Sequence, residues 1–300
     1  MTTSSSPLPA APAPLLAAPA PRTRRRMGRF TSAHAAALVG VVLILGLALT
    51  AILAPQLAPY DPTERVGKPF APPSAAHRLG ANDIGQDILS ELIYGTRVSL
   101  LVGALSALIA IVIGTAVGLL AGYYRRAGLL LMRLVDIILV LPFLPLLIVL
   151  AAYLGRSLTN TILVIGLLIW AGTARVIRAQ VLSLTHQDYV LAAHAVGVRD
   201  GHILLRHLLP QVLLLAVGQF VEATSAAILL ESSLSFLGLG DPLQKSWGSV
   251  LYWAQARGAF MTPAWTWWVL PPGLLIVAAA LGFALVGFAV EQILNPRLRR

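Results

Sequence analysis

Six apolar stretches of about membrane-spanning length constrain this 300-residue chain more than any other feature. A hydrocarbon core about 30 Å thick requires about 20 residues of helix at a rise of about 1.5 Å per residue. The stretches lie at 35–54, 98–122, 129–153, 161–176, 211–236 and 268–293. We therefore predict an all-α membrane protein with six transmembrane helices.

The composition supports this class and excludes others. Hydrophobic residues make up 57% of the chain and charged residues 11%, whereas soluble domains carry about 25% charged residues. The net charge of +10 does not indicate nucleic-acid binding, because the basic residues cluster at the ends of the apolar stretches, as membrane orientation requires. The chain contains no cysteine, which excludes a disulfide scaffold and thiolate metal sites.

The charge distribution also predicts the orientation of the chain. Arginines are concentrated at 22–29, before the first apolar stretch, and at 297–300, after the last one. Basic residues are retained in the cytoplasm. We therefore expect both termini to be cytoplasmic, with 1–28 forming a disordered tail and 294–300 a short one. A signal peptide is the alternative at the N-terminus, but the stretch at 35–54 exceeds the usual h-region of about 7–15 residues, which favours an uncleaved span.

The most polar segment between two apolar stretches runs over 188–210. Its small residues, which let another backbone approach closely, are Ala192, Ala193, Ala195 and Gly197. Gly197 tolerates positive φ and suits a turn between two short helices. Asp200 is a candidate N-cap of the second short helix, and Pro210 suits the first turn of the next helix. This pattern predicts a protruding loop that docks into a recess on another protein.

The spacing of this segment resembles the cytoplasmic loop of permease subunits of ABC importers. That loop reads Glu-Ala-Ala, three residues, Gly, nine residues, Ile, one residue, Leu-Pro. The matching positions here are Ala192, Ala193, Gly197, Leu209 and Pro210. Leu191 stands where the family usually has Glu, and His207 where it usually has Ile. The resemblance implies a coupling loop at about 186–210, including Asp200, on which an ATPase subunit docks.

Three further stretches resemble the C-type permease subunits of the dipeptide, oligopeptide and nickel transport group. They lie before the second span at 79–100, in the third span at 132–142, and at the start of the last outside segment at 231–248. The first of them departs from the usual Thr, Arg and Arg at Ala81, Gln86 and Glu91. Together with the loop, these stretches extend the resemblance over about 36–299, nearly the whole chain.

The resemblance implies a type I ABC importer permease fold and transport by alternating access. The implied partners are a second permease subunit in a heterodimer, two cytoplasmic ATP-binding subunits, an extracytoplasmic solute-binding protein and membrane lipid. The implied organisation is a first span with an extracytoplasmic segment at 29–94, followed by a core transmembrane domain at 95–293. Small peptides are the expected substrate, and nickel, glutathione or sugars are alternatives.

No catalytic or cofactor-binding motif is apparent in the sequence. The chain has no Walker loop, and its two lysines, Lys68 and Lys245, lie outside any such context, so ATP would be bound by partner subunits. The histidines of the coupling loop are eight, eight and five residues apart, unlike metal ligands on one helical face. We therefore predict a non-enzymatic subunit that binds no metal, cofactor or nucleic acid.

Two patterns within the spans predict helix packing. Arg133 and Asp136 are three residues apart. They are therefore neighbours on a helix, and we expect a structural ion pair. Gly114, Gly118 and Gly122 recur every four residues, and we expect this stripe of small residues to pack against another helix, because lipid provides no hydrophobic driving force.

Two patterns outside the spans predict contacts with the membrane interface. Residues 83–94 gather apolar side chains on one helical face, with Asp87 and Glu91 opposite, which predicts a helix lying in the interface. Five tryptophans fall between 247 and 268, and an interfacial aromatic belt accounts for them.

One glutamate is predicted to lie at mid-membrane. Glu222 follows Pro210 by twelve residues, about 18 Å along a helix, whereas Glu231 is predicted to reach the outer interface. A mid-membrane carboxylate is costly unless it pairs or faces water, so Glu222 is a candidate pathway residue. The alternative is a structural glutamate, protonated or hydrogen-bonded to Thr224 or Ser225.

Two other classes of protein are alternatives to an ABC importer permease. A proton-coupled secondary transporter would use Asp136, Glu222 or Glu231 as a proton relay and would need no docking loop. A membrane-embedded enzyme would require a catalytic constellation, which the sequence does not display.

Overall fold

The computed structural model describes residues 27–294, with side chains from His34 to Gln292. The arginine clusters at 22–29 and 297–300, on which the predicted disorder and orientation depend, lie outside the residues whose side chains are described. The regular secondary structure of the described part is helical throughout, with no strand apart from two isolated bridges, and a long segment without helix lies between Leu57 and Ile88.

Five helices of the described region are long and apolar enough to cross a membrane, and a sixth crossing results when one bent pair is counted as a single span. The five crossings contain α1 (Met27–Ile52), α3 (Ile88–Tyr123), α6 (Leu158–Thr185), α9 (Leu209–Phe236) and α11 (Leu270–Leu294). The predicted all-α membrane fold is confirmed, with six spans when the bent pair is counted as one.

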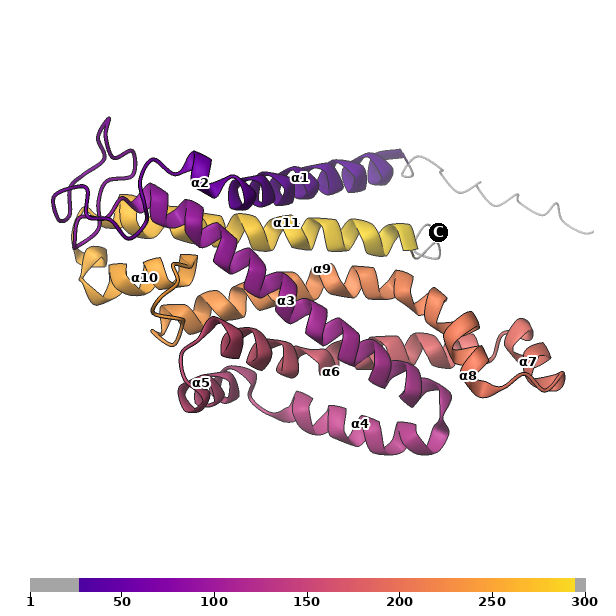
Figure 1. Cartoon of the computed structure of the whole chain (residues 1–300). Coiled ribbons are helices and arrows are strands. Elements are labelled where there is room, and N and C mark those ends of the chain that lie inside the picture. The colour runs from indigo at the N-terminus through magenta and orange to yellow at the C-terminus, as the bar shows by residue number, and fades with distance from the viewer. Residues whose placement is uncertain (1–26, 295–300) are drawn as a thin grey trace, which may run out of the picture.

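The two ends of the helix bundle carry different structures (Figure 1). We call the end with α7 (Asp188–Ala195) the α7 end, and the opposite end, with α10 (Trp247–Ala256), the α10 end. Figure 1 shows that α1 begins and α11 ends at the α7 end. The described ends of the chain therefore lie on the same side of the bundle as the predicted coupling loop.

Helix α3 is the central element, packed most extensively against α6 and α9. The glycine stripe faces α6 as predicted. A Cβ at Gly114 would lie 2.7 Å from the Thr173 Cβ, and one at Gly122 would lie 2.6 Å from the Val181 Cβ. These distances leave no room for a side chain, so the glycines permit the close approach of the two backbones.

The third predicted span is broken. Helix α4 (Arg125–Val140) and α5 (Phe143–Leu154) meet at an angle of 89°. Leu141 has extended backbone angles, and Pro142 is the N-cap residue of α5, as expected because proline disfavours helical geometry at the preceding residue. The third apolar stretch therefore contains a right-angled break.

Two other spans accommodate prolines by a wider helical turn. The π-helical segment η1 (Ile203–Leu208) directly precedes α9, which has Pro210 in its first turn, and η3 (Trp265–Val269) directly precedes α11 with Pro271 and Pro272. A proline ring clashes with the carbonyl four residues earlier, and π-type turns redirect that carbonyl. The helix therefore continues through each proline.

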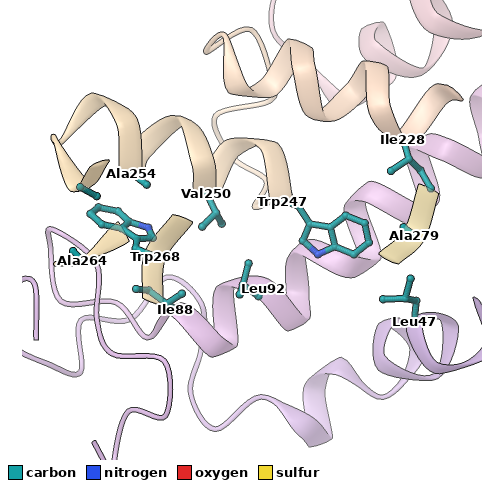
Figure 2. Close-up of a cluster of buried hydrophobic side chains, with 11 residues drawn as sticks. Leu47, Ile88, Leu92, Ile228, Trp247, Val250, Ala254, Ala264, Trp268 and Ala279 are labelled. Atoms are coloured by element: carbon teal, nitrogen blue, oxygen red, sulfur yellow. The ribbon is translucent and has the colours of Figure 1, made fainter. Parts of the chain in front are cut away.

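The core of the α10 end joins segments that are distant in the sequence (Figure 2). Trp247 and Trp268 are 0% and 1% exposed, so two tryptophans predicted to form an interfacial belt are core residues. The labelled side chains around them are Leu47, Ile88, Leu92, Ile228, Val250, Ala254, Ala264 and Ala279. The start of α3 is therefore held between α10, η3 and α11.

The predicted interfacial helix at 83–94 is wrong. Helix α3 begins directly after Asp87, and both Asp87 and Glu91 are buried, at 0% and 2% exposure. The two acids are internal because each has a partner: His77 Nδ1 lies 3.0 Å from Asp87 Oδ1, and Lys245 Nζ pairs with Glu91 Oε1. Helical periodicity placed them opposite the apolar face but did not reveal these partners.

Candidate functional site

The predicted coupling loop, at about 186–210, lies at the α7 end, and its outermost part consists of α7, α8 (Asp200–His202) and the turn between them (Figure 1). Gly197 lies in this turn with a φ of 77°, as predicted. A Cβ at this position would meet no atom within 4 Å. Glycine is therefore needed here for the left-handed backbone and not for space, and the surface around the turn is open.

Helix α7 has one buried face and one exposed apolar face. Val190 is fully buried in a cluster with residues of α3, α6, η1 and α9, and Ala193 packs against the same cluster. Leu191 is 53% exposed, and Val196, directly after α7, is 79% exposed. Ala192 is exposed as well. The loop is thus anchored in the bundle by the buried face of α7, and its small and apolar residues on the other face are exposed.

Tyr123, the last residue of α3, contacts both halves of the coupling loop. Its hydroxyl donates to Asp200 Oδ1 at 2.8 Å and lies 3.3 Å from His194 Nε2. Its ring also stacks on that of His194, with the centroids 6.0 Å apart. The predicted N-cap role of Asp200 is wrong, because Arg199 occupies the N-cap position and makes no side-chain cap bond. The Asp200 carboxylate is engaged by the Tyr123 hydroxyl instead.

A second contact joins α7 to α9. Gln211 Nε2 donates to the Tyr189 hydroxyl at 2.7 Å. Leu209 is half-buried and packs against the cluster that holds Val190. Pro210 is exposed in the first turn of α9, as predicted. The structure therefore brings the predicted loop residues together at one end of the bundle.

Glu222 lies near the middle of α9, and its side chain is exposed. It accepts a hydrogen bond from Gln219 Nε2 at 3.2 Å. The alternative partners, Thr224 and Ser225, donate instead to backbone carbonyls of α9 and α11. This carboxylate is therefore available at the surface of the chain, which is unfavourable against lipid.

Asp136 forms its ion pair with a different arginine from the one predicted. Arg175 Nη2 of α6 lies 2.8 Å from Asp136 Oδ1, so the pair joins α4 to α6 instead of linking Arg133 to Asp136 within α4. In the sequence order Arg133–Asp136 the acid follows the base, which is the weaker orientation on a helix. Arg175 reaches the carboxylate from the neighbouring helix.

Glu231 lies in the last two turns of α9 and is buried, at 2% exposure. Its carboxylate accepts hydrogen bonds from Ser235 at 2.7 Å and Ser99 at 3.2 Å. The adjoining cavity is about 10 Å³, room for about one water molecule. These bonds satisfy the carboxylate within the bundle, which favours a structural role.

The α10 end contains a cluster of hydrogen-bonded polar and charged side chains that the sequence analysis did not identify as a group. Lys245 Nζ donates to Glu91 and to Gln86 Oε1, the latter at 2.9 Å. Asn82 Nδ2 donates to the same two acceptors, at 3.1 Å and 3.0 Å. One signal in the sequence could have indicated this cluster. Gln86 and Glu91 both stand where the resembled family usually has Arg, and two such differences in one region can share a partner.

Two protein families match most of the chain. The profile of the family described as binding-protein-dependent transport system inner membrane component matches residues 90–300. The profile described as N-terminal TM domain of oligopeptide transport permease C matches residues 24–73.

Individual relatives align with this chain over about nine-tenths or more of both sequences. A putative peptide transport system permease protein of Brucella abortus biovar 1 is 38% identical over 92% of this chain and 92% of the relative. The di/tripeptide transport system permease protein DppC of Pseudomonas aeruginosa is 37% identical over 96% and 97%. The glutathione transport system permease protein GsiD of Pectobacterium atrosepticum is 34% identical over 90% of each.

Proposed function

The chain belongs to the family of binding-protein-dependent transport system inner membrane components, and from this premise we propose that it forms part of the transmembrane pathway of an ATP-driven importer for di- and oligopeptides. It is a multi-pass protein of the plasma membrane. The peptide substrate is proposed from relatives named as peptide and di/tripeptide permeases, which match more than nine-tenths of the chain. Nickel and sugars find no support among these names.

Membership of this family implies that the chain works with ATPase and solute-binding components. We propose the finer assembly of one heterodimer with a second permease, two cytoplasmic ATP-binding subunits and one extracytoplasmic solute-binding protein. ATP hydrolysis then occurs on the partner subunits, and this chain is a non-catalytic part of the pathway.

The observation that carries the proposal is the coupling loop. Its small and apolar residues, including Ala192 and Val196, face outward on a helix that is anchored in the bundle by Val190. Contiguous exposed apolar residues at the rim of a protein mark interaction sites. An ATPase that covered this surface would push on α7 when its dimer closes, and that movement drives alternating access.

The orientation follows from this assignment. If the ATPases dock at the α7 end, that end is cytoplasmic, and the described ends of α1 and α11 lie there too. The arginine clusters at 22–29 and 297–300, which flank α1 and α11 in the sequence, support this choice. The α10 end then faces the solute-binding protein.

Glu222 is proposed to line the pathway. Its exposed carboxylate, halfway along α9, would face the second permease across a water-filled passage, where a peptide amine is a suitable cationic partner. Charged residues within membrane spans characteristically face such cavities.

Reconstitution of the complete importer with bulky substitutions in the coupling loop tests the proposal. The chain is co-expressed with the second permease, the ATPases and the binding protein encoded with it, and uptake of radiolabelled dialanine is measured in proteoliposomes. Ala193→Leu with Gly197→Leu is expected to reduce ATP-dependent uptake more than tenfold and to remove the ATPase from the purified complex. The reason is that leucine at Ala193 overfills the contact with the buried cluster and displaces α7, and leucine is strained at the positive φ of Gly197, so the docking surface is moved out of place.

The matched control combines Ala193→Gly with Gly197→Asn, because asparagine tolerates the left-handed backbone and both side chains stay small. This variant is expected to retain most uptake. Normal uptake by the leucine variant would exclude docking at this loop. A wild-type complex that takes up glutathione but no dipeptide would replace the peptide substrate class and leave the coupling loop unaffected.

A further inference from the structure

We propose that Tyr123 is a positioning residue that fastens the coupling loop to the end of α3, so that movement of the docked ATPase is passed to the central helix. The inference rests on the proposed function and adds a specific residue to it. Nothing in the spacing of the coupling loop indicates this role, because Tyr123 belongs to a separate apolar stretch.

One hydroxyl holds both sides of the Gly197 turn. A tyrosine hydroxyl has one proton to donate and lone pairs that accept. The Tyr123 hydroxyl donates to Asp200 Oδ1 at 2.8 Å in α8, so at 3.3 Å it accepts from His194 Nε2–H in the last turn of α7. The bond to the carboxylate is charge-assisted and therefore among the stronger kinds.

The other contacts of α7 reach α3 by apolar packing. Val190 lies in one buried cluster with Leu119 of α3 and with residues of α6, η1 and α9, and Tyr189 bonds to Gln211 of α9. Among the hydrogen bonds of the described side chains, those of Tyr123 are the ones that join α3 to the loop. A loop released from the Tyr123 hydroxyl would still be docked, but it would keep only non-directional apolar contacts with α3 and would follow its movement less closely.

Helix α3 is suited to carry that movement through the bundle. It is a single helix of 36 residues, about 54 Å long. Its glycines lie so close to α6 that side chains cannot fit between the backbones. Its first turns are fixed at the α10 end, where Glu91 pairs with Lys245 and Thr96 accepts from Trp247 Nε1. A displacement at Tyr123 is thereby connected to the opposite end of the bundle.

The test separates attachment of the loop from docking of the ATPase. Tyr123→Phe removes the hydroxyl and keeps the ring, and Asp200→Ala removes its acceptor. Asp200→Asn retains an oxygen that accepts from tyrosine and serves as the conservative rescue. Tyr124→Phe is the matched control, because it deletes the hydroxyl of the next residue, whose ring lies edge-on to Tyr123 at 4.9 Å.

Two quantities are measured for each variant. The first is hydrogen–deuterium exchange over 188–202 in the purified chain in lipid nanodiscs. The second is dialanine imported per ATP hydrolysed by the reconstituted complex. Tyr123→Phe and Asp200→Ala are expected to raise exchange and to lower import per ATP about fivefold, the factor that corresponds to one lost hydrogen bond. The ATPase should remain bound in Tyr123→Phe, Asp200→Asn should recover most of the exchange protection that Asp200→Ala loses, and Tyr124→Phe should resemble the wild type.

Unchanged exchange in Tyr123→Phe would overturn the proposal, and so would an unchanged ratio of import to ATP hydrolysis. Loss of the ATPase from this variant would also overturn it, because Tyr123 would then act in docking. A wild-type complex without ATP-dependent uptake would contradict the proposed function instead. In that case the exchange measurement, which needs only the chain, still decides whether Tyr123 holds the loop.

Discussion

The two ends of the bundle are stabilised in opposite ways. At the α10 end, the start of α3 is enclosed, with Glu91 and Trp247 2% and 0% exposed and an ion pair to Lys245 in the interior. At the α7 end, the coupling loop is attached by one buried side chain, Val190, and a few side-chain hydrogen bonds at its surface, while Val196 remains 79% exposed. At one end the polar side chains find their partners in the interior, and at the other apolar side chains remain exposed in the isolated chain.

The difference identifies where local stability should be lowest. Segments with few buried apolar contacts and exposed hydrogen bonds open most readily, and elements that move are drawn from them. The comparison therefore predicts large stability effects at the α10 end and transport effects elsewhere.

The largest effect on stability is expected from Lys245→Ala. This change leaves the Glu91 carboxylate buried without its cation, and breaking a buried pair in this way costs about 3–5 kcal/mol of unfolding free energy. Denaturant unfolding in detergent micelles measures the loss. Lys68→Ala removes the only other lysine of the chain, which is exposed, and should change stability by less than about 0.5 kcal/mol. Equal losses in the two variants would mean that the α10 end is no more fixed than its surroundings.

A smaller effect, on transport alone, is expected midway between the two ends. Glu222→Gln keeps the shape of the side chain and a hydrogen-bond acceptor for Gln219 but removes the charge. Uptake of dipeptides by the reconstituted importer should fall several-fold, with assembly and basal ATPase activity preserved. Uptake kinetics that stay unchanged across several dipeptides, at normal expression, would leave Glu222 a structural residue.

The smallest effect is expected from Asp136→Asn. Its ion pair with Arg175 joins α4 to α6, but the two side chains are 53% and 58% exposed, and pairs of this kind contribute about 1 kcal/mol or less. Unfolding free energy should therefore change far less than in Lys245→Ala. A loss comparable to that of Lys245→Ala would show that this pair is shielded in the assembled importer and would weaken the contrast between the ends.

Sequence reasoning succeeded where the signal lies within one element. The apolar stretches predicted the spans, the four-residue glycine repeat predicted the face of α3 that meets α6, and Gly197 and Pro210 occupy the turn and helix start that their backbone preferences indicate. Each of these follows from helical geometry or from the φ angle of a single residue.

It failed where a side chain finds its partner across the bundle. Asp136 bonds to a residue 39 positions away, Tyr123 to one 77 away, and Lys245 to one 154 away. Helical periodicity assigned Asp87 and Glu91 to an exposed face because it cannot reveal a cation brought from another segment. Only the packing of whole helices decides these pairs.

The right-angled break between α4 and α5 determines what must surround this part of the chain. Helix α4 has 16 residues, about 24 Å, which is shorter than a hydrocarbon core of about 30 Å. Pro142 has no N–H to offer the last turn of α4, and acyl chains have none either. Val140 and Leu141 nevertheless lie 82% and 43% exposed. The carbonyls of this turn therefore need hydration or donors from a neighbouring subunit, which predicts that the break lies against water or another subunit and not against acyl chains.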